Sequence, residues 1–116
     1  ASDLPVEVRT EGDLQHVPAG VELSVYRIVQ EALTNVRRHA GPVHHVEVSL
    51  SRLPQSLVVE VADDGRGAAS TSAHDDDGFG LLGMRERVAA YDGELVAGPR
   101  GGGGWRVRAT FPLERP

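Results

Sequence analysis

The order of hydrophobic periodicities is the feature that most restricts the fold of this 116-residue chain. Val6–Thr10 alternates apolar and polar residues, as a short strand does, whereas apolar residues in Val21–His39 recur every three or four positions, as on one helix face. Two runs rich in β-branched residues follow, His45–Ser51 and Leu57–Ala62, and their short separation predicts a hairpin of adjacent strands. A strand and a helix are thus followed directly by two strands.

The second half of the chain shows the same kind of order. Leu81–Tyr91 has helical spacing and is ended by Asp92 and Gly93, and the segments Glu94–Ala97 and Arg106–Phe111 read as a last strand pair. The small polar stretch 64–77 has no periodicity and predicts a mobile loop. This order predicts an α+β fold, a two-layer α/β sandwich with helices on one face of a mixed sheet, because a doubly wound fold would alternate strand and helix more strictly.

Composition limits the classes of protein to which the chain can belong. Its length suits a single domain, residues 1–116 with a core at about 5–113. The net charge of −5 argues against a nucleic-acid partner, and the absence of cysteine excludes disulfides and thiolate metal sites. We expect a cytoplasmic, monomeric piece of a longer protein that makes no direct membrane contact, although the parent protein could be membrane-anchored. His16, His44, His45 and His74 have no metal-ligand spacing and are expected at the surface.

The first of three separated polar segments lies on the predicted helix Val21–His39. Glu31, Asn35 and Arg38 are spaced four and three residues apart, so they share one helix face, which we place roughly opposite the apolar stripe that includes Val25. The neutral amide oxygen of Asn35 suits Mg²⁺, which prefers oxygen ligands and keeps several waters. Arg38 supplies positive charge for a phosphate.

The second and third segments are rich in glycine. Asp63 ends an apolar strand, and its carboxylate can only accept hydrogen bonds, so it would favour a base with an exocyclic amine. Asp64 is expected to be only a solvated turn residue. The segment Gly78–Met84 leads into a helix, whose unpaired N-terminal amides form a site for phosphate. It is not a P-loop, because the Gly-Lys-Ser/Thr ending is absent.

In this order and spacing the three segments resemble the catalytic ATP-binding domain of sensor histidine kinases, whose superfamily includes gyrase, the ninety-kilodalton chaperone and the mismatch-repair ATPases. The resemblance covers roughly residues 5–113. It implies ATP and Mg²⁺ as cofactors, with Asn35 on the metal, Arg38 and His39 on the phosphates and Asp63 on the adenine amine. Glu31 falls where the ATPase members place a general base, but kinases of this kind often take the base from beside the acceptor histidine. The further cofactor-binding residues that it implies are Gly65, Gly67, Gly78, Gly80, Leu81, Gly83 and Met84.

Two shorter segments narrow the resemblance to one kinase subfamily. Gly83–Val88 and Asp92-Gly-Glu94 are similar to kinases whose partners are response regulators with helix-turn-helix output domains. The implied function is donation of the γ-phosphoryl group of ATP to a histidine on a separate dimerisation and phosphotransfer domain of the same protein, for relay to such a regulator. One departure is Trp105, at a position where many superfamily members have threonine. We expect Trp105 to be a surface or packing residue, with a stacking platform as the alternative, and Thr110 is the candidate for a second polar contact near adenine.

Three other functions remain compatible with parts of the pattern. A serine kinase of the anti-sigma-factor type shares the fold, although the residues Gly83–Val88 disfavour it. A degenerate, nucleotide-free interaction module would show substitutions in the site, but Asn35, Asp63 and the glycines are intact. A clamp of the gyrase kind would use Glu31, a longer chain and a lysine from a second domain, and this sequence has no lysine.

Overall fold

The computed structural model describes residues 4–65 and 80–114. Their elements follow the predicted order of strand, helix, two strands, helix, two strands, and each boundary lies within two residues of the predicted one. The elements are β1 (Val6–Glu11), α1 (Ala19–His39), β2 (Val46–Leu53), β3 (Ser56–Asp63), α3 (Leu81–Ala89), β4 (Glu94–Pro99) and β5 (Trp105–Pro112). None of the helices described is both long and apolar enough to span a bilayer.

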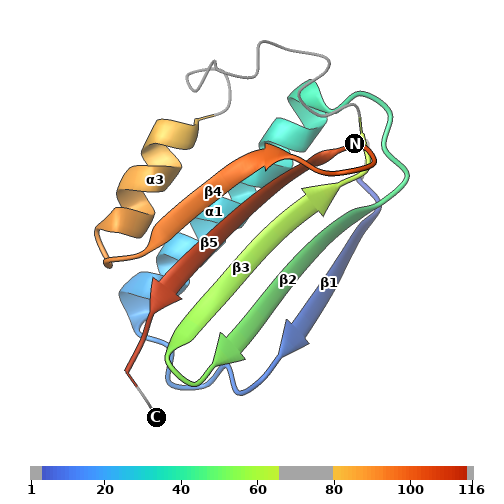
Figure 1. Cartoon of the computed structure of the whole chain (residues 1–116). Coiled ribbons are helices and arrows are strands. Elements are labelled where there is room, and N and C mark those ends of the chain that lie inside the picture. The colour runs from blue at the N-terminus through green and yellow to red at the C-terminus, as the bar shows by residue number, and fades with distance from the viewer. Residues whose placement is uncertain (1–3, 66–79, 115–116) are drawn as a thin grey trace.

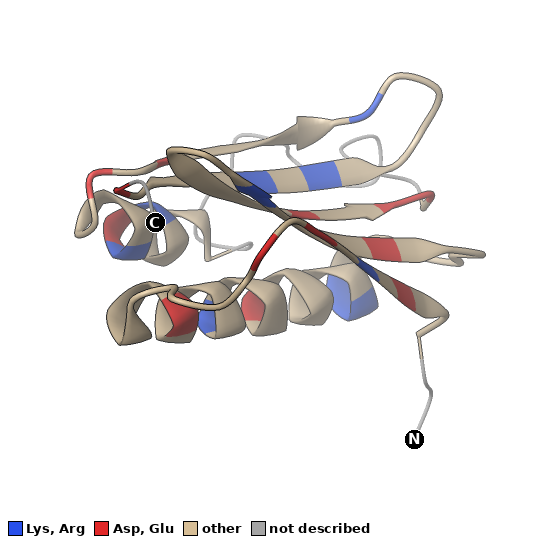
Figure 2. Cartoon of the chain, turned by 90° about the horizontal axis from the view of Figure 1, so that it is seen from below, with Lys and Arg blue, Asp and Glu red and all other residues tan. Residues whose placement is uncertain are grey.

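One five-stranded mixed sheet organises the molecule (Figure 1). Its strand order is β1-β2-β3-β5-β4, in which β1 and β2 are parallel and all other neighbours are antiparallel. The hairpin predicted for the second and third strands is confirmed, since Leu53 pairs with Ser56 at its turn. Both helices cover the same face of the sheet, with α1 on β3 and α3 on β4 and β5 (Figure 2). The predicted α+β two-layer sandwich is therefore confirmed.

The alternation of side chains along β5 shows which face of the sheet is buried. Trp105, Val107, Ala109 and Phe111 are buried beneath the helices, whereas the residues between them lie on the open face. That open face carries ion pairs between neighbouring strands, such as Arg108 with Glu60 at 2.8 Å. The hydrophobic core thus lies between the sheet and the two helices.

The buried face of α1 includes Asn35, and our expectation that this residue lies opposite the apolar stripe is wrong. The buried residues of the helix are Val21, Ser24, Val25, Ile28, Ala32, Asn35 and Val36. This face is centred on Ile28, and Asn35 follows Ile28 by seven residues, close to two full turns, so both point toward the sheet. Glu31 is half-buried at the edge of the face, and Arg38 is exposed.

Asp64 ties the end of β3 to the loop that precedes β2. Its Oδ1 atom accepts hydrogen bonds from the amides of His44 at 2.9 Å and His45 at 3.1 Å. Desolvation opposes ionisation of this carboxyl, but the amides of His44, His45 and Asp64 itself and the charge of His44 act in the opposite direction, and the pKa of Asp64 is lowered from its ordinary value of 3.8. Asp64 is thus more than the solvated turn residue that its position in the sequence suggests.

A lowered folded-state pKa makes Asp64 a source of pH-dependent stability. Its contribution is present at neutral pH and is lost as the pH falls through the folded pKa, below 3.8. We expect Asp64→Asn to unfold at a lower temperature than wild type at neutral pH, and the difference to shrink at about pH 3. Thermal unfolding at several pH values tests this, with Glu114→Gln as a control on an exposed carboxylate. A constant difference at all pH values would contradict the role.

Candidate functional site

A pocket lies between the C-terminal half of α1 and the strands β3 and β5, and its cavity volume is about 20 Å³, enough for about one water molecule. Its walls are mostly apolar, and three polar side chains converge on it from the helix and from β3. Such a combination is typical of a small-molecule site. The lining residues are Ala32, Asn35, Val36, His39, Ala40, Val61, Asp63, Trp105 and Val107.

Asp63 is the buried acid of this pocket, with 2% of its surface exposed. Burial raises the pKa of its carboxyl, while the Gly65 amide, which donates to Oδ1 at 2.7 Å, acts in the opposite direction. The charge of Asp64 raises the pKa further, whereas Arg100 and the Trp105 amide lower it, and the net direction is upward. The predicted acceptor at the end of the strand is therefore present, held by main-chain amides in a desolvated position.

Gly65 allows the end of β3 to approach the end of α1. A Cβ atom at this position would lie 2.5 Å from the Ala40 carbonyl oxygen and 2.7 Å from the Ala40 Cβ, so no side chain fits there. Gly65, which the resemblance implies as a cofactor-binding residue, therefore lies directly against the end of α1. Gly67, which the resemblance also implies as cofactor-binding, lies outside the described residues.

The polar residues of α1 divide between the pocket and its surroundings. Asn35 and His39 line the pocket together with Asp63, as the three-segment pattern requires. Arg38 is exposed and is not among the lining residues. The Glu31 carboxylate instead adjoins Gly80, since a Cβ on that glycine would lie 3.0 Å from Glu31 Oε2. The first and third segments therefore meet at the start of α3.

The N-terminus of α3 can offer a ligand its main-chain amides, as predicted, rather than the side chains of Leu81 and Met84. Leu81 and Met84 are buried in the hydrophobic core, and the Met84 amide already donates to the Gly80 carbonyl at 3.2 Å. Gly80 has a φ of +66°, which a glycine adopts easily, and Gly83 has open space where a Cβ would lie. The amides of residues 81–83 remain suitable for phosphate. Gly78 and Phe79 lie outside the described residues.

Thr110 lies far from the pocket, so the expectation that it provides a second polar contact there is wrong. It pairs with Val58 in β3 and shares the open face of the sheet with Arg106 and Arg108, whereas the pocket lies on the helix-covered face. Ala62, next to Asp63, pairs with Arg106, which is four residues and about 13 Å along the strand from Thr110. The strand register thus separates Thr110 from the acid.

Trp105 forms part of the pocket wall, a role that the sequence motifs did not indicate. It is 8% exposed within the core, so of the two roles that we expected, surface or packing, the structure shows packing, and it also lines the pocket beside Asp63. The motifs also did not indicate the other lining residues that are small or apolar. Their place on the buried face of α1, or on alternate positions of β3 and β5, is the signal that could have located them.

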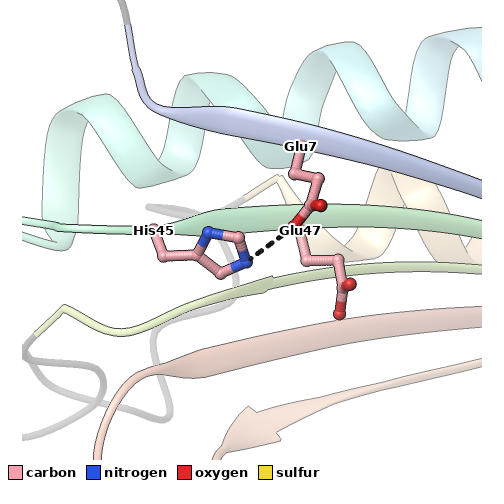
Figure 3. A group of neighbouring side chains, drawn as sticks. All are labelled: Glu7, His45 and Glu47. Atoms are coloured by element: carbon pink, nitrogen blue, oxygen red, sulfur yellow. Dashed lines mark ion pairs between the residues drawn. The ribbon is translucent and has the colours of Figure 1, made fainter.

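A second group of polar residues lies at the β1 and β2 edge of the sheet (Figure 3). Ligand atoms of Glu7, His45 and Glu47 all lie within 4.8 Å of one another, although the spacing of the histidines did not suggest such a group. His45 Nε2 lies 3.5 Å from a Glu7 carboxylate oxygen, and Glu47 pairs with Arg9 at 2.7 Å. Because Arg9 already balances the charge of Glu47 and the side chains are largely exposed, we interpret the group as surface ion pairs.

Comparisons with known proteins agree with this fold. Residues 20–115 match the family described as histidine kinase-, DNA gyrase B- and HSP90-like ATPase. The kinase/phosphatase DegS of Brevibacillus brevis is 33% identical over 108 residues, covering 93% of this chain and 28% of DegS. The sensor histidine kinase YxjM of Bacillus subtilis is 36% identical over 113 residues, covering 97% of this chain and 27% of YxjM. The histidine kinase domain of Erythrobacter litoralis EL346 superposes with a TM-score of 0.71 at 28% identity, covering 93% of this chain and 55% of that one.

The fold and these comparisons thus define an ATPase domain of the histidine-kinase type. The chain belongs to the histidine kinase-, DNA gyrase B- and HSP90-like ATPase family. It spans between a quarter and a third of the length of DegS and YxjM.

Proposed function

We propose that this domain binds Mg-ATP as the catalytic part of a sensor histidine kinase. The observation that carries the proposal is the buried Asp63 carboxylate at the edge of a largely apolar pocket. A planar base that separates these apolar walls would meet the carboxylate, which accepts a hydrogen bond from the exocyclic amine of adenine. Guanine presents a carbonyl at the same position, so Asp63 would discriminate against it.

The phosphate groups would extend from the pocket toward the region where α1 meets α3. Asn35 offers an amide oxygen on the pocket wall, which fits Mg²⁺ because this ion takes one or two protein oxygens and keeps phosphate and water ligands. When bound, the ion would neutralise phosphate charge. His39 and the exposed Arg38 add positive or hydrogen-bonding groups, and the first amides of α3 point along the helix axis toward the same end.

Phosphoryl transfer depends mainly on positioning and on charge stabilisation. In this proposal the domain holds ATP so that its γ-phosphoryl group reaches a histidine on a dimerisation and phosphotransfer domain of the same protein. A response regulator with a helix-turn-helix output domain then receives the group. Glu31 remains the candidate base, and its carboxylate beside Gly80 is compatible with a place near the phosphates. The names of DegS and YxjM support the kinase assignment.

Calorimetric titration with ADP and a non-hydrolysable ATP analogue, with and without Mg²⁺, tests the proposal. We expect saturable binding that is tighter with Mg²⁺, and no comparable binding of GTP. In Asn35→Ala, binding in the presence of Mg²⁺ should weaken by about fivefold or more, so that Mg²⁺ no longer tightens binding. Binding without Mg²⁺ should change less, because the removed amide acts on the ion. Gln30→Ala is a matched control on the exposed side of α1. Equal losses with and without Mg²⁺ would contradict the metal role of Asn35.

A further inference from the structure

The loop between β4 and β5 closes on the main chain of Asp63. The Nη1 atom of Arg100 donates a hydrogen bond to the Asp63 carbonyl oxygen at 2.7 Å. These residues are 37 positions apart in the sequence. None of the three nucleotide-binding segments includes Arg100, and it does not line the pocket. It nevertheless contacts the residue on which adenine recognition depends.

The loop that carries Arg100 is itself held in a defined conformation. The Arg100 amide donates to the Gly104 carbonyl at 3.0 Å, and the Gly103 amide donates to the Arg100 carbonyl at 3.2 Å. Gly104 has a φ of +97°, and a Cβ on it would overlap the carbonyl oxygen of Asp63. The loop backbone and the Arg100 side chain therefore approach the same carbonyl group. Trp105, the next residue, donates its amide to the Asp63 carboxyl and forms a pocket wall.

Asp63 is consequently held at both of its polar ends. Arg100 fixes the carbonyl, while the Gly65 amide, at 2.7 Å from Oδ1, and the Trp105 amide fix the carboxylate. A hydrogen bond weakens steeply as its angle departs from linearity, so the direction of the carboxylate sets how well it accepts the adenine amine. Loss of the Arg100 contact would allow the end of β3 to rotate.

We propose that Arg100 is a positioning residue for adenine recognition, which acts through its hydrogen bond to the Asp63 carbonyl. The inference rests on the proposed function, because it assigns Arg100 to the base end of that site. A positioning role can be distinguished from two other roles that Arg100 could have. A direct phosphate contact would make the loss depend on the phosphates, and a purely structural role would weaken all ligands alike.

The test compares two ligands that differ only at the group that Asp63 recognises. ADP has the exocyclic amine, and purine riboside diphosphate lacks it. For Arg100→Ala we expect about tenfold weaker binding of ADP and less than about twofold weaker binding of the analogue, since one oriented hydrogen bond is affected. Arg100→Lys, which keeps a donor and a charge, should recover most of the ADP affinity. Arg106→Ala removes a charge from the open face of β5 and should change neither affinity.

Each outcome separates the inference from the proposed function. Equal losses for both ligands in Arg100→Ala, or no loss for ADP, would overturn the positioning role. A failure of Arg100→Lys to bind ADP better than Arg100→Ala would do the same. If wild type prefers ADP to the analogue and Asp63→Asn removes the preference, the proposed function stands even where Arg100 fails. If the folded wild-type domain does not bind ADP, both are overturned.

Discussion

Asp63→Asn should weaken ADP binding by about a hundredfold or more, because the new side-chain amide and the exocyclic amine of adenine are both hydrogen-bond donors. The Asn oxygen would continue to accept the Gly65 amide, which now lies 2.7 Å from Oδ1 of the acid. The amide nitrogen would then face the exocyclic amine of adenine, and neither group can accept. Calorimetric titration with ADP measures the loss.

The same substitution should leave the domain at least as stable at neutral pH. Burial raises the folded-state pKa of Asp63 above its ordinary 3.8, so the folded protein holds the proton more tightly than the unfolded chain does. Stability is therefore greatest below the unfolded pKa and falls as the pH rises through the folded pKa. Asparagine is neutral throughout and avoids that loss, so thermal unfolding at about pH 7 should occur at the wild-type temperature or above it.

Asp64→Asn is the matched control, since it removes the adjacent carboxylate, which is exposed and contacts the His44 and His45 amides instead of the pocket. It should bind ADP with nearly wild-type affinity despite its lower stability. Weak binding in Asp63→Asn together with a lower unfolding temperature would indicate a structural role for the acid. Unchanged ADP affinity in that variant would contradict the adenine assignment.

Local periodicity predicted the fold, because each element buries one face and its apolar residues repeat with the period of that element. It also placed Asp63, since a polar residue that ends an apolar strand lies at the edge of the core. The prediction for the face of Asn35 is wrong because the buried face of α1 is centred on Ile28, and not on the side of the helix that the position of Val25 alone indicates. That centre depends on how α1 packs on the sheet.

Two features of the site depend on contacts that no local pattern encodes. The register between β3 and β5 puts Thr110 beside Val58 on the open face, and a shift of one residue would have turned its side chain toward the helices. The bond from Arg100 to Asp63 joins a hairpin loop to the end of another strand, through a loop conformation that the glycines permit. The contact is made by Arg100, which directly precedes the glycines 101–104 of this loop.

Gly104→Ala should destabilise the domain by about 3 kcal/mol and should also weaken ADP binding, because the change affects backbone strain and packing at once. The φ of +97° disfavours any side chain, and the new methyl group would overlap the Asp63 carbonyl oxygen. Relief of that overlap requires the loop to move away from β3, which would break the contact of Arg100 and shift the Trp105 wall.

Substitutions at two neighbouring glycines distinguish the effect of backbone strain from the effect of steric overlap with Asp63. Gly101 has open space and no positive φ, so Gly101→Ala should change stability by less than about 0.5 kcal/mol. Gly102 has open space but a φ of +88°, so Gly102→Ala should cost about 1 kcal/mol through strain alone. Urea unfolding of the three variants should rank the losses as Gly101, Gly102 and Gly104, and only Gly104→Ala should weaken ADP binding more than about threefold. Similar stability losses at Gly102 and Gly104 would mean that the close approach to Asp63 does not hold the loop against β3.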